Sequence, residues 1–179
     1  MLMKKLISSL FLLLLFLTAC SNNIDFVEEG PFVELELYSA SAGTYLDHFP
    51  EIITVSSNGE VNLFTEEMVS RSGRVEMKVD KDVPKVEKKI SAEEVEEIKD
   101  VIEKNKFFSL PTDVTDYGVM DGGGSKITVY GKNQEKTVGG ENTDNDKYLE
   151  IRNIIFKQVK DEYSDWLEET EDYLFDLNG

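Results

Sequence analysis

The sequence has little of the residues that carry most nucleophilic and metal chemistry, because its 179 residues include one cysteine and one histidine. A single cysteine, Cys20, excludes a disulfide within the chain. Structural zinc needs four cysteine or histidine ligands, so it is excluded too. A serine or cysteine nucleophile that relies on histidine would have His48 alone as its base. His48 stands beside Phe49 and Pro50, a setting typical of a packing or loop residue, so the sequence favours a protein without catalytic activity.

Positive charge is scarce as well. The chain has 19 basic and 36 acidic side chains, which gives a net charge of −17. Nucleic acid and anionic lipid headgroups repel such a chain, so we exclude nucleic acid as a partner. Any electrostatic partner should be cationic, either a basic protein surface or a divalent metal ion.

Long apolar runs are limited to one, from Leu6 to Leu17, which follows the basic pair Lys4 and Lys5. A run of about 12 residues is too short for a membrane-spanning helix, which needs roughly 18 to 20, but it suits the core of a signal peptide. Residues 1–19 are therefore predicted to be a signal peptide. Its removal lowers the basic side chains to 17 against 36 acidic ones, a net charge of −19.

The end of this run points to a lipid anchor. Leu17, Thr18 and Ala19 directly precede Cys20. This order resembles the lipobox of bacterial lipoproteins, which implies cleavage before Cys20 and attachment of a diacylglycerol and an acyl chain such as palmitate to that residue. Two or more acyl chains anchor a protein stably. We therefore expect the protein at the cell membrane, lipid-anchored and facing the extracytoplasmic side, with the membrane as its first partner.

The first half of the mature chain predicts strands. Residues 20–30 are predicted to be the lipidated cysteine and a polar tether, and 31–179 a single domain. Apolar residues alternate over 33–37 and again over 74–79, which is typical of half-buried strands. Asn58-Gly59 lies between the apolar runs 52–55 and 61–64 and predicts a hairpin.

Helices are predicted after residue 90. Ser91 and Glu94 form a capping-box pattern ahead of apolar residues at helical spacing, which predicts a helix to about Asn105. A second hairpin is expected around 131–134. From Asp144 apolar residues recur every three or four positions, and we expect one or two helices with a break near 161–164. The fold class is therefore α+β, with an antiparallel sheet built from hairpins, one central helix and one or two C-terminal helices.

One stretch resembles a known family. From Lys89 to Val138 the chain has an Ile-Ser-Ala-Glu-Glu helix start, a Phe-Phe-Ser-Leu-Pro exit, an Asp121-Gly122 loop and an Ile-Thr-Val-Tyr hairpin. This order is similar to a domain that recurs in uncharacterised bacterial lipoproteins. The resemblance implies the fold and the location, and no activity.

Calcium is the metal that the sequence best supports. Asn142, Asp144 and Asp146 occupy positions one, three and five of an EF-hand-like loop, where oxygen ligands stand. The pattern departs at position six, Lys147, and at position twelve, Asn153, which should be glycine and glutamate. The same residues suit the start of a helix, where Asn and Asp cap free amides. Capping is the favoured interpretation, and a calcium-dependent structural module remains an alternative.

A second alternative is an enzyme that uses carboxylates for hydrolysis. Pairs of acids hydrolyse glycosides, and an exported protein meets wall glycans. Asp113, Asp116 and Asp121 lie in a loop with four glycines and would be the acids of a hydrolase of cell-envelope material.

The C-terminal segment is strongly acidic. After Lys160 it has no basic residue and eight acids, and it also contains Tyr163, Trp166 and Tyr173. A solvated face is favoured over a docking surface for a basic protein, and the aromatic residues fit either core or anchors. The sequence as a whole predicts a membrane-anchored extracytoplasmic binding or interaction protein without catalysis.

Overall fold

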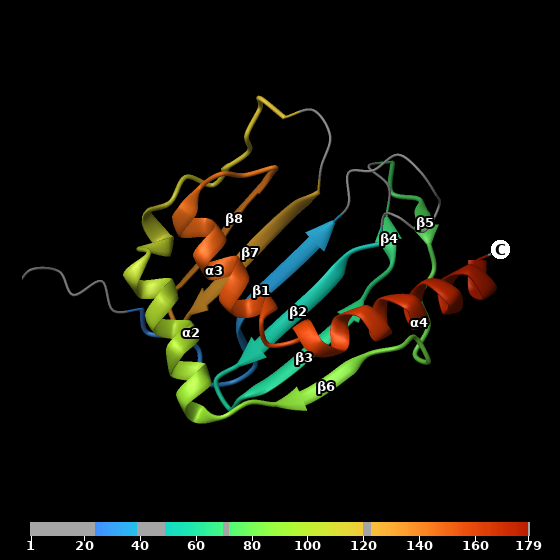
Figure 1. Ribbon diagram of the computed structural model, residues 1–179, viewed down its shortest axis with the longest axis horizontal. Helices are drawn as coiled ribbons and strands as arrows, with labels where there is room; N and C mark the ends of the chain where they lie inside the picture. Colours follow the sequence, from blue (N-terminus) through green and yellow to red (C-terminus); the bar gives the residue numbers. More distant parts are fainter. Residues whose placement is uncertain (1–23, 39–48, 70–71, 120–122, 179) are drawn as a thin grey trace, which may run out of the picture.

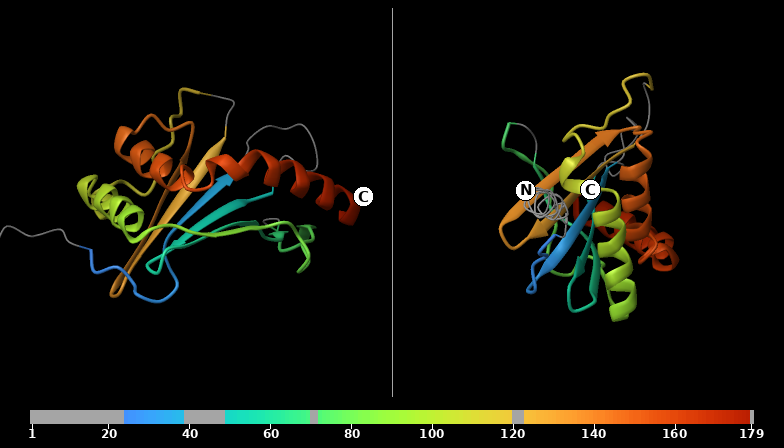
Figure 2. Two further views of the ribbon diagram at one scale, coloured as in Figure 1. Left: turned by 60° about the horizontal axis from the view of Figure 1, so that its bottom comes forward. Right: turned by 90° about the vertical axis from the view of Figure 1, so that its left-hand side faces the viewer.

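A computed structural model describes residues 24–38, 49–69, 72–119 and 123–178 of the chain. They form a six-stranded antiparallel sheet in the order β6-β3-β2-β1-β7-β8, a small second sheet of β4 and β5, and helices on one face (Figures 1 and 2). The α+β fold predicted from the sequence is confirmed. Within the described residues, no helix combines the length and apolarity that crossing a membrane requires.

The strands are β1 (Pro31–Tyr38), β2 (Glu51–Ser56), β3 (Glu60–Thr65), β4 (Met68–Val69), β5 (Val75–Met77), β6 (Val86–Lys89), β7 (Gly124–Gly131) and β8 (Gln134–Glu141). The helices are α2 (Ala92–Lys104), α3 (Asp146–Phe156) and α4 (Lys160–Asn178), with a short 3₁₀ turn, η1 (Phe107–Ser109), after α2.

The core lies between the sheet and the helices. In the middle of the sheet, Leu35 pairs with Ile53 on one side and Ile127 on the other, and all three side chains are fully buried. Ile98 of α2 and Ile151 of α3 close this layer from the helix side. The helices therefore cover one apolar face of the sheet. The opposite face is mixed, since Glu36 there is paired with the buried Ile52.

The predicted hairpin at Asn58-Gly59 is confirmed. Gly59 has φ +87°, which a side chain rarely tolerates, and it joins β2 to β3. A Cβ there would also lie 2.6 Å from the carbonyl oxygen of Ile90. The capping box is confirmed too, because the Ser91 hydroxyl accepts a hydrogen bond from the Glu94 amide while the Glu94 carboxylate accepts one from the Ser91 amide.

Two predictions need correction in detail. The break in the C-terminal helical segment was expected near 161–164, but α3 ends at Phe156 and α4 begins at Lys160. The corner lies earlier because Gln158 and Val159 are buried there. Beyond the corner, α4 continues on the same face of the sheet, toward β6 (Figure 1). The alternating run 74–79 contributes β5 to the small sheet and not to the main one, whose sixth strand is β6.

The segment Ile24 to Glu28 is held against the domain. The Ile24 amide donates to the Glu103 carboxylate at 2.8 Å, and Phe26 forms an antiparallel bridge with Gly131. Lys132 adds ion pairs to two carboxylates of the same segment. Of the predicted tether, 20–30, only the part before Ile24 remains available to act as one.

Candidate functional site

The side chains beneath the helices are apolar in most rows of the sheet, but one row contains small and polar residues. The rows that contain Val33 and Leu35 are filled by large apolar side chains. In the next row, on the same face, Leu37 pairs with Glu51 on β2 and with Ser125 on β7, and Ser125 pairs with Gly140 on β8. Small and polar residues therefore replace bulky ones at this end of the sheet.

A cavity of about 340 Å³ results. Strands, helices and loops all contribute to its wall, whose residues are Leu37, Tyr38, Glu51, Gly123, Gly124, Ser125, Gly140, Asn142, Thr143, Leu149, Arg152 and Tyr163. This volume lies at the lower end of the range for small-molecule sites.

Glycines allow the chain to pack closely at the rim of the cavity. A Cβ on Gly124 would lie 2.2 Å from the Tyr38 ring, and one on Gly140 would lie 2.5 Å from the Thr115 amide nitrogen. Both distances are far below contact distance. The glycine at 124 thus lets the Tyr38 ring lie across β7.

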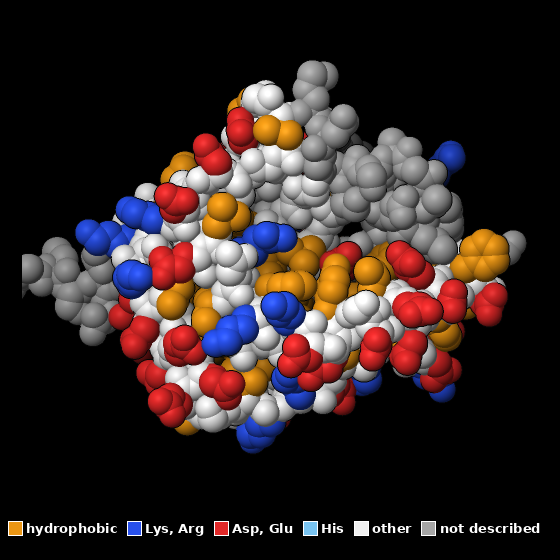
Figure 3. Space-filling model, in the orientation of Figure 1, with side chains coloured by type: hydrophobic (Ala, Val, Ile, Leu, Met, Phe, Trp, Pro, Cys, Tyr) orange, Lys and Arg blue, Asp and Glu red, His pale blue; other side chains and the backbone are white. Residues whose placement is uncertain are grey.

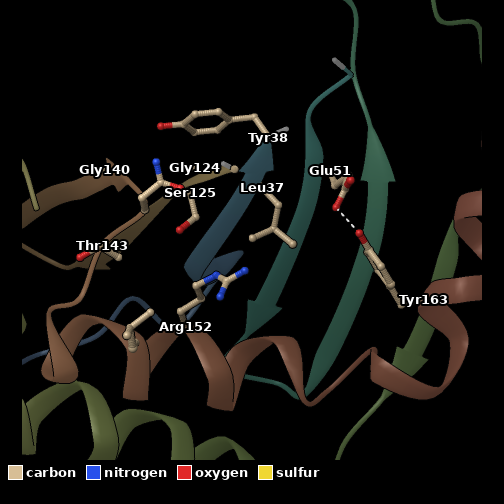
Figure 4. Close-up of a pocket in the computed structure, with 12 residues that line it drawn as sticks. Leu37, Tyr38, Glu51, Gly124, Ser125, Gly140, Thr143, Arg152 and Tyr163 are labelled. Atoms are coloured by element: carbon tan, nitrogen blue, oxygen red, sulfur yellow. Dashed lines mark hydrogen bonds between the residues drawn. The ribbon is translucent and has the colours of Figure 1, made fainter. Parts of the chain in front are cut away.

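Arg152 supplies the positive charge of the cavity. Figure 4 shows its side chain rising from α3 toward the sheet, with the guanidinium between Ser125 and the Glu51–Tyr163 pair. Its Nε atom is buried and has no hydrogen-bond partner among the residues that the structure describes. Buried polar atoms are normally paired, since an unpaired one costs about 1–3 kcal/mol and more when charged.

Glu51 supplies a negative charge on the opposite wall. Its carboxylate accepts a hydrogen bond of 2.6 Å from the Tyr163 hydroxyl of α4. Burial raises the pKa of Glu51 above its ordinary 4.5, although this hydrogen bond and the charge of Arg152 oppose the rise. Burial and the bond to Glu51 also raise the pKa of Tyr163, so the phenol stays protonated and acts as a donor.

Neutral hydroxyls complete the polar part of the site. Ser125 and the fully buried Tyr148 share a hydrogen bond of 2.8 Å between their hydroxyl oxygens. Burial raises the pKa of Tyr148 to about 12. Of the described residues that line the cavity, none is a histidine or a cysteine. The arrangement is suited to holding a polar ligand by hydrogen bonds and charge, and among its described lining residues no nucleophile is hydrogen-bonded to a base.

The surface around the cavity is uneven in charge. In Figure 3, acidic side chains crowd the faces over α2 and α4, whereas apolar side chains are visible in a hollow between α3 and α4 with basic side chains beside it. On this face the acidic side chains gather over the helices, and the hollow itself is bordered by basic side chains.

Several predicted residues lie outside the described residues. They are Leu17, Thr18, Ala19 and Cys20 of the lipobox, His48, and Asp121 of the glycine loop. The lipid anchor therefore stays a prediction.

The calcium candidates have other neighbours. The residue that caps α3 is Asn145, whose side chain accepts a hydrogen bond from the Tyr148 amide at 3.1 Å. It is not one of the three calcium candidates. Asn142 has φ +50° and lines the cavity, and Asp146 opens the helix. Across the described ranges, no three acidic, histidine or cysteine side chains come together as a metal site would need.

The two described loop carboxylates shape the loop. Hydrogen bonds to Asp113 from the Thr115 side chain, the Tyr117 hydroxyl and the Thr115 amide hold the pKa of its carboxyl down at about 2. Asp116 accepts one from the Gly118 amide. A general acid needs a raised pKa, so the setting of Asp113 is the reverse of what that role requires.

The three aromatic residues of α4 that the sequence singled out contact the domain, whereas Phe175 of the same helix is exposed. Trp166 is buried and donates from Nε1 to the Pro84 carbonyl at 3.0 Å, and the hydroxyl of Tyr173 donates to Asp80. With Tyr163 bound to Glu51, all three point to the domain itself. Most acids of α4 remain on its outer side, and a basic protein partner stays a prediction.

Arg152, Glu51 and Ser125 were not predicted from the sequence as site residues. A signal was present, because continuing the alternation of Val55 and Ile53 by two residues places Glu51 on the buried face. The same extension from Ile127 reaches Ser125. Arg152 follows the buried Ile151 directly, at the border of the apolar stripe of α3.

Comparison of the sequence with protein-family models and with curated proteins finds no match. The resemblance to a lipoprotein domain therefore stays a prediction that rests on the quoted motifs.

The raised pKa of Glu51 predicts a pH-dependent stability difference from Glu51→Gln. A carboxyl whose pKa is higher in the folded state stabilises the fold, and the full stabilisation is present below about pH 4.5, the pKa of the unfolded state. The stabilisation is lost as the pH rises through the pKa of the folded state. Urea unfolding from pH 4.5 to pH 8 should therefore show wild type losing stability relative to Glu51→Gln. The exposed Glu60→Gln serves as the control. A difference that stays constant with pH would contradict the assignment.

Proposed function

We propose that this protein is a lipid-anchored, extracytoplasmic binding protein that holds a small ligand in the cavity through an anionic group bound to Arg152. The lipobox-like sequence ending at Cys20 supports the location. The cavity supports the binding role, and the absence of a nucleophile and base pair from its described lining supports a role without catalysis.

The unpaired Nε of Arg152 carries the proposal. Arg152 is partly buried, and a cation withdrawn from water is tolerated when a counter-charge or hydrogen-bond acceptors satisfy it. Arg152 has no ion pair with any described residue, and its Nε lacks a partner there. A carboxylate or phosphate suits the planar guanidinium, which donates in parallel to two oxygens. Ser125 and Thr143 stand in the same wall as neutral hydrogen-bonding groups.

The position of the cavity also suits a membrane-anchored binding protein. Cys20 precedes the docked residue Ile24 by a stretch that spans at most roughly 14 Å. Ile24 lies near the Gly131 end of β7, whereas the cavity is at the Gly124 end, about 23 Å away along the strand. The anchored end and the cavity are thus at opposite ends of the sheet, so the membrane would not obstruct the ligand.

Small anions should stabilise the protein through Arg152. Full-length protein in detergent is heated with phosphate, sulfate, acetate or succinate at about 10 mM and constant ionic strength. A ligand present at 100 times its Kd stabilises the fold by about 2.7 kcal/mol, which is a readily measured rise in Tm. At least one carboxylate or phosphate should raise the Tm of wild type, and Arg152→Gln should remove the rise.

Lys147→Gln is the matched control, because it removes a positive charge from an exposed position on the same helix. It should respond as wild type does. An Arg152→Gln variant that is folded and stabilised equally by the same anions would refute binding at this site.

The anchor is tested separately. Wild-type protein should fractionate with membranes, and its intact mass should include a diacylglycerol and an acyl chain, since a thiol at position 20 accepts the lipid. Cys20→Ala should lack that mass, whereas Ser21→Ala, a neighbouring change that keeps the thiol, should retain it. Unlipidated mature wild-type protein, detected by intact mass spectrometry, would disprove the anchor.

A further inference from the structure

The cavity contains a second charged group whose role anion binding leaves unexplained. Glu51 lies in the inward row of the sheet, two strands from Ser125, and lines the same cavity as Arg152 from the opposite wall. Among the described residues its side chain has one hydrogen bond, from Tyr163 at 2.6 Å. A carboxylate has about four acceptor positions, so most of its hydrogen-bonding capacity faces no described donor.

Glu51 and Arg152 do not neutralise each other by direct contact. No ion pair within 4.0 Å joins them, although Arg152 is close enough to lower the pKa of Glu51. Figure 4 shows the reason, since the guanidinium and the carboxylate come from opposite sides of the space, one from α3 and one from β2. A gap lined by one cation and one anion remains between them.

We infer that the ligand is a zwitterion of the amino-acid class, either a free amino acid or a short peptide, with its carboxylate on Arg152 and its ammonium on Glu51. This inference rests on the proposed function, because it assigns the ligand of the same cavity. A molecule with both charges satisfies both groups and adds no net charge to a buried site. An anion alone would satisfy Arg152 and place a second negative charge near Glu51.

The remaining wall accommodates the rest of such a molecule. Leu37 and Leu149 provide apolar surface, and Tyr38 adds an aromatic ring at the rim. A cavity of about 340 Å³ accommodates an amino acid or a dipeptide. Gly123 at the edge of the same wall is exposed, so no side chain blocks the approach of a ligand there.

The test is a comparison of matched ligands. Thermal shift of the full-length protein is measured with the twenty standard L-amino acids and their glycyl dipeptides. The strongest binder is then compared by calorimetry with two analogues, one that lacks the amino group and one that lacks the carboxylate. Each analogue should bind at least tenfold more weakly than the zwitterion.

Variants separate this inference from the proposed function. Glu51→Gln keeps an acceptor for Tyr163 and should lower the affinity for the zwitterion at least tenfold, whereas the affinity for the carboxylate analogue should stay the same or rise, because a negative charge near it is removed. Glu60→Gln is the control. If the carboxylate analogue binds wild type as tightly as the zwitterion does, the inference fails and the anion site stands. If neither zwitterions nor any of the simple anions, phosphate and sulfate included, bind to wild type, both fail.

Discussion

The strand register decides what the cavity contains. Side chains of a strand alternate between two faces, so once Ile53 packs beneath the helices, Glu51 must point the same way. The same constraint turns Ser125 inward two residues before Ile127. Because α3 and α4 meet at a corner around Val159, Arg152 and Tyr163 reach this row from two different helices. The sheet thus sets the polar row, and the helix corner brings the groups that complete it.

This arrangement opposes folding. A guanidinium nitrogen without a partner and a partly buried carboxylate both lose hydration that the described protein groups only partly replace. An apolar residue at either position would fill the cavity and remove that cost. Local conflicts of this kind are expected mainly at functional sites, where a ligand supplies the missing partner. The Glu51 carboxylate is held in place by the neutral Tyr163 hydroxyl and not by a cation, so its charge stays available to a ligand.

Much of the fold was predictable because its signals are local. The Asn58-Gly59 hairpin and the capped helix α2 depend on residues within a few positions of each other, and both predictions are confirmed. The corner between α3 and α4 was misplaced because burial of Gln158 and Val159 against the domain sets it, and periodicity in that segment is continuous. The site was missed because its contacts are distant in the chain. Glu51 and Tyr163, for example, are 112 residues apart.

The chain offers a direct measurement of the central claim, that Arg152 binds the ligand. It contains three arginines, Arg71, Arg74 and Arg152, so protein labelled with ¹⁵N-arginine gives at most three Nε–H signals in a two-dimensional NMR spectrum. Arg152→Lys assigns one of them. On addition of the strongest-binding carboxylate or amino acid, the Arg152 signal should move and the signals of the other arginines should stay. A ligand that raises the Tm but leaves the Arg152 signal unmoved would contradict the central claim.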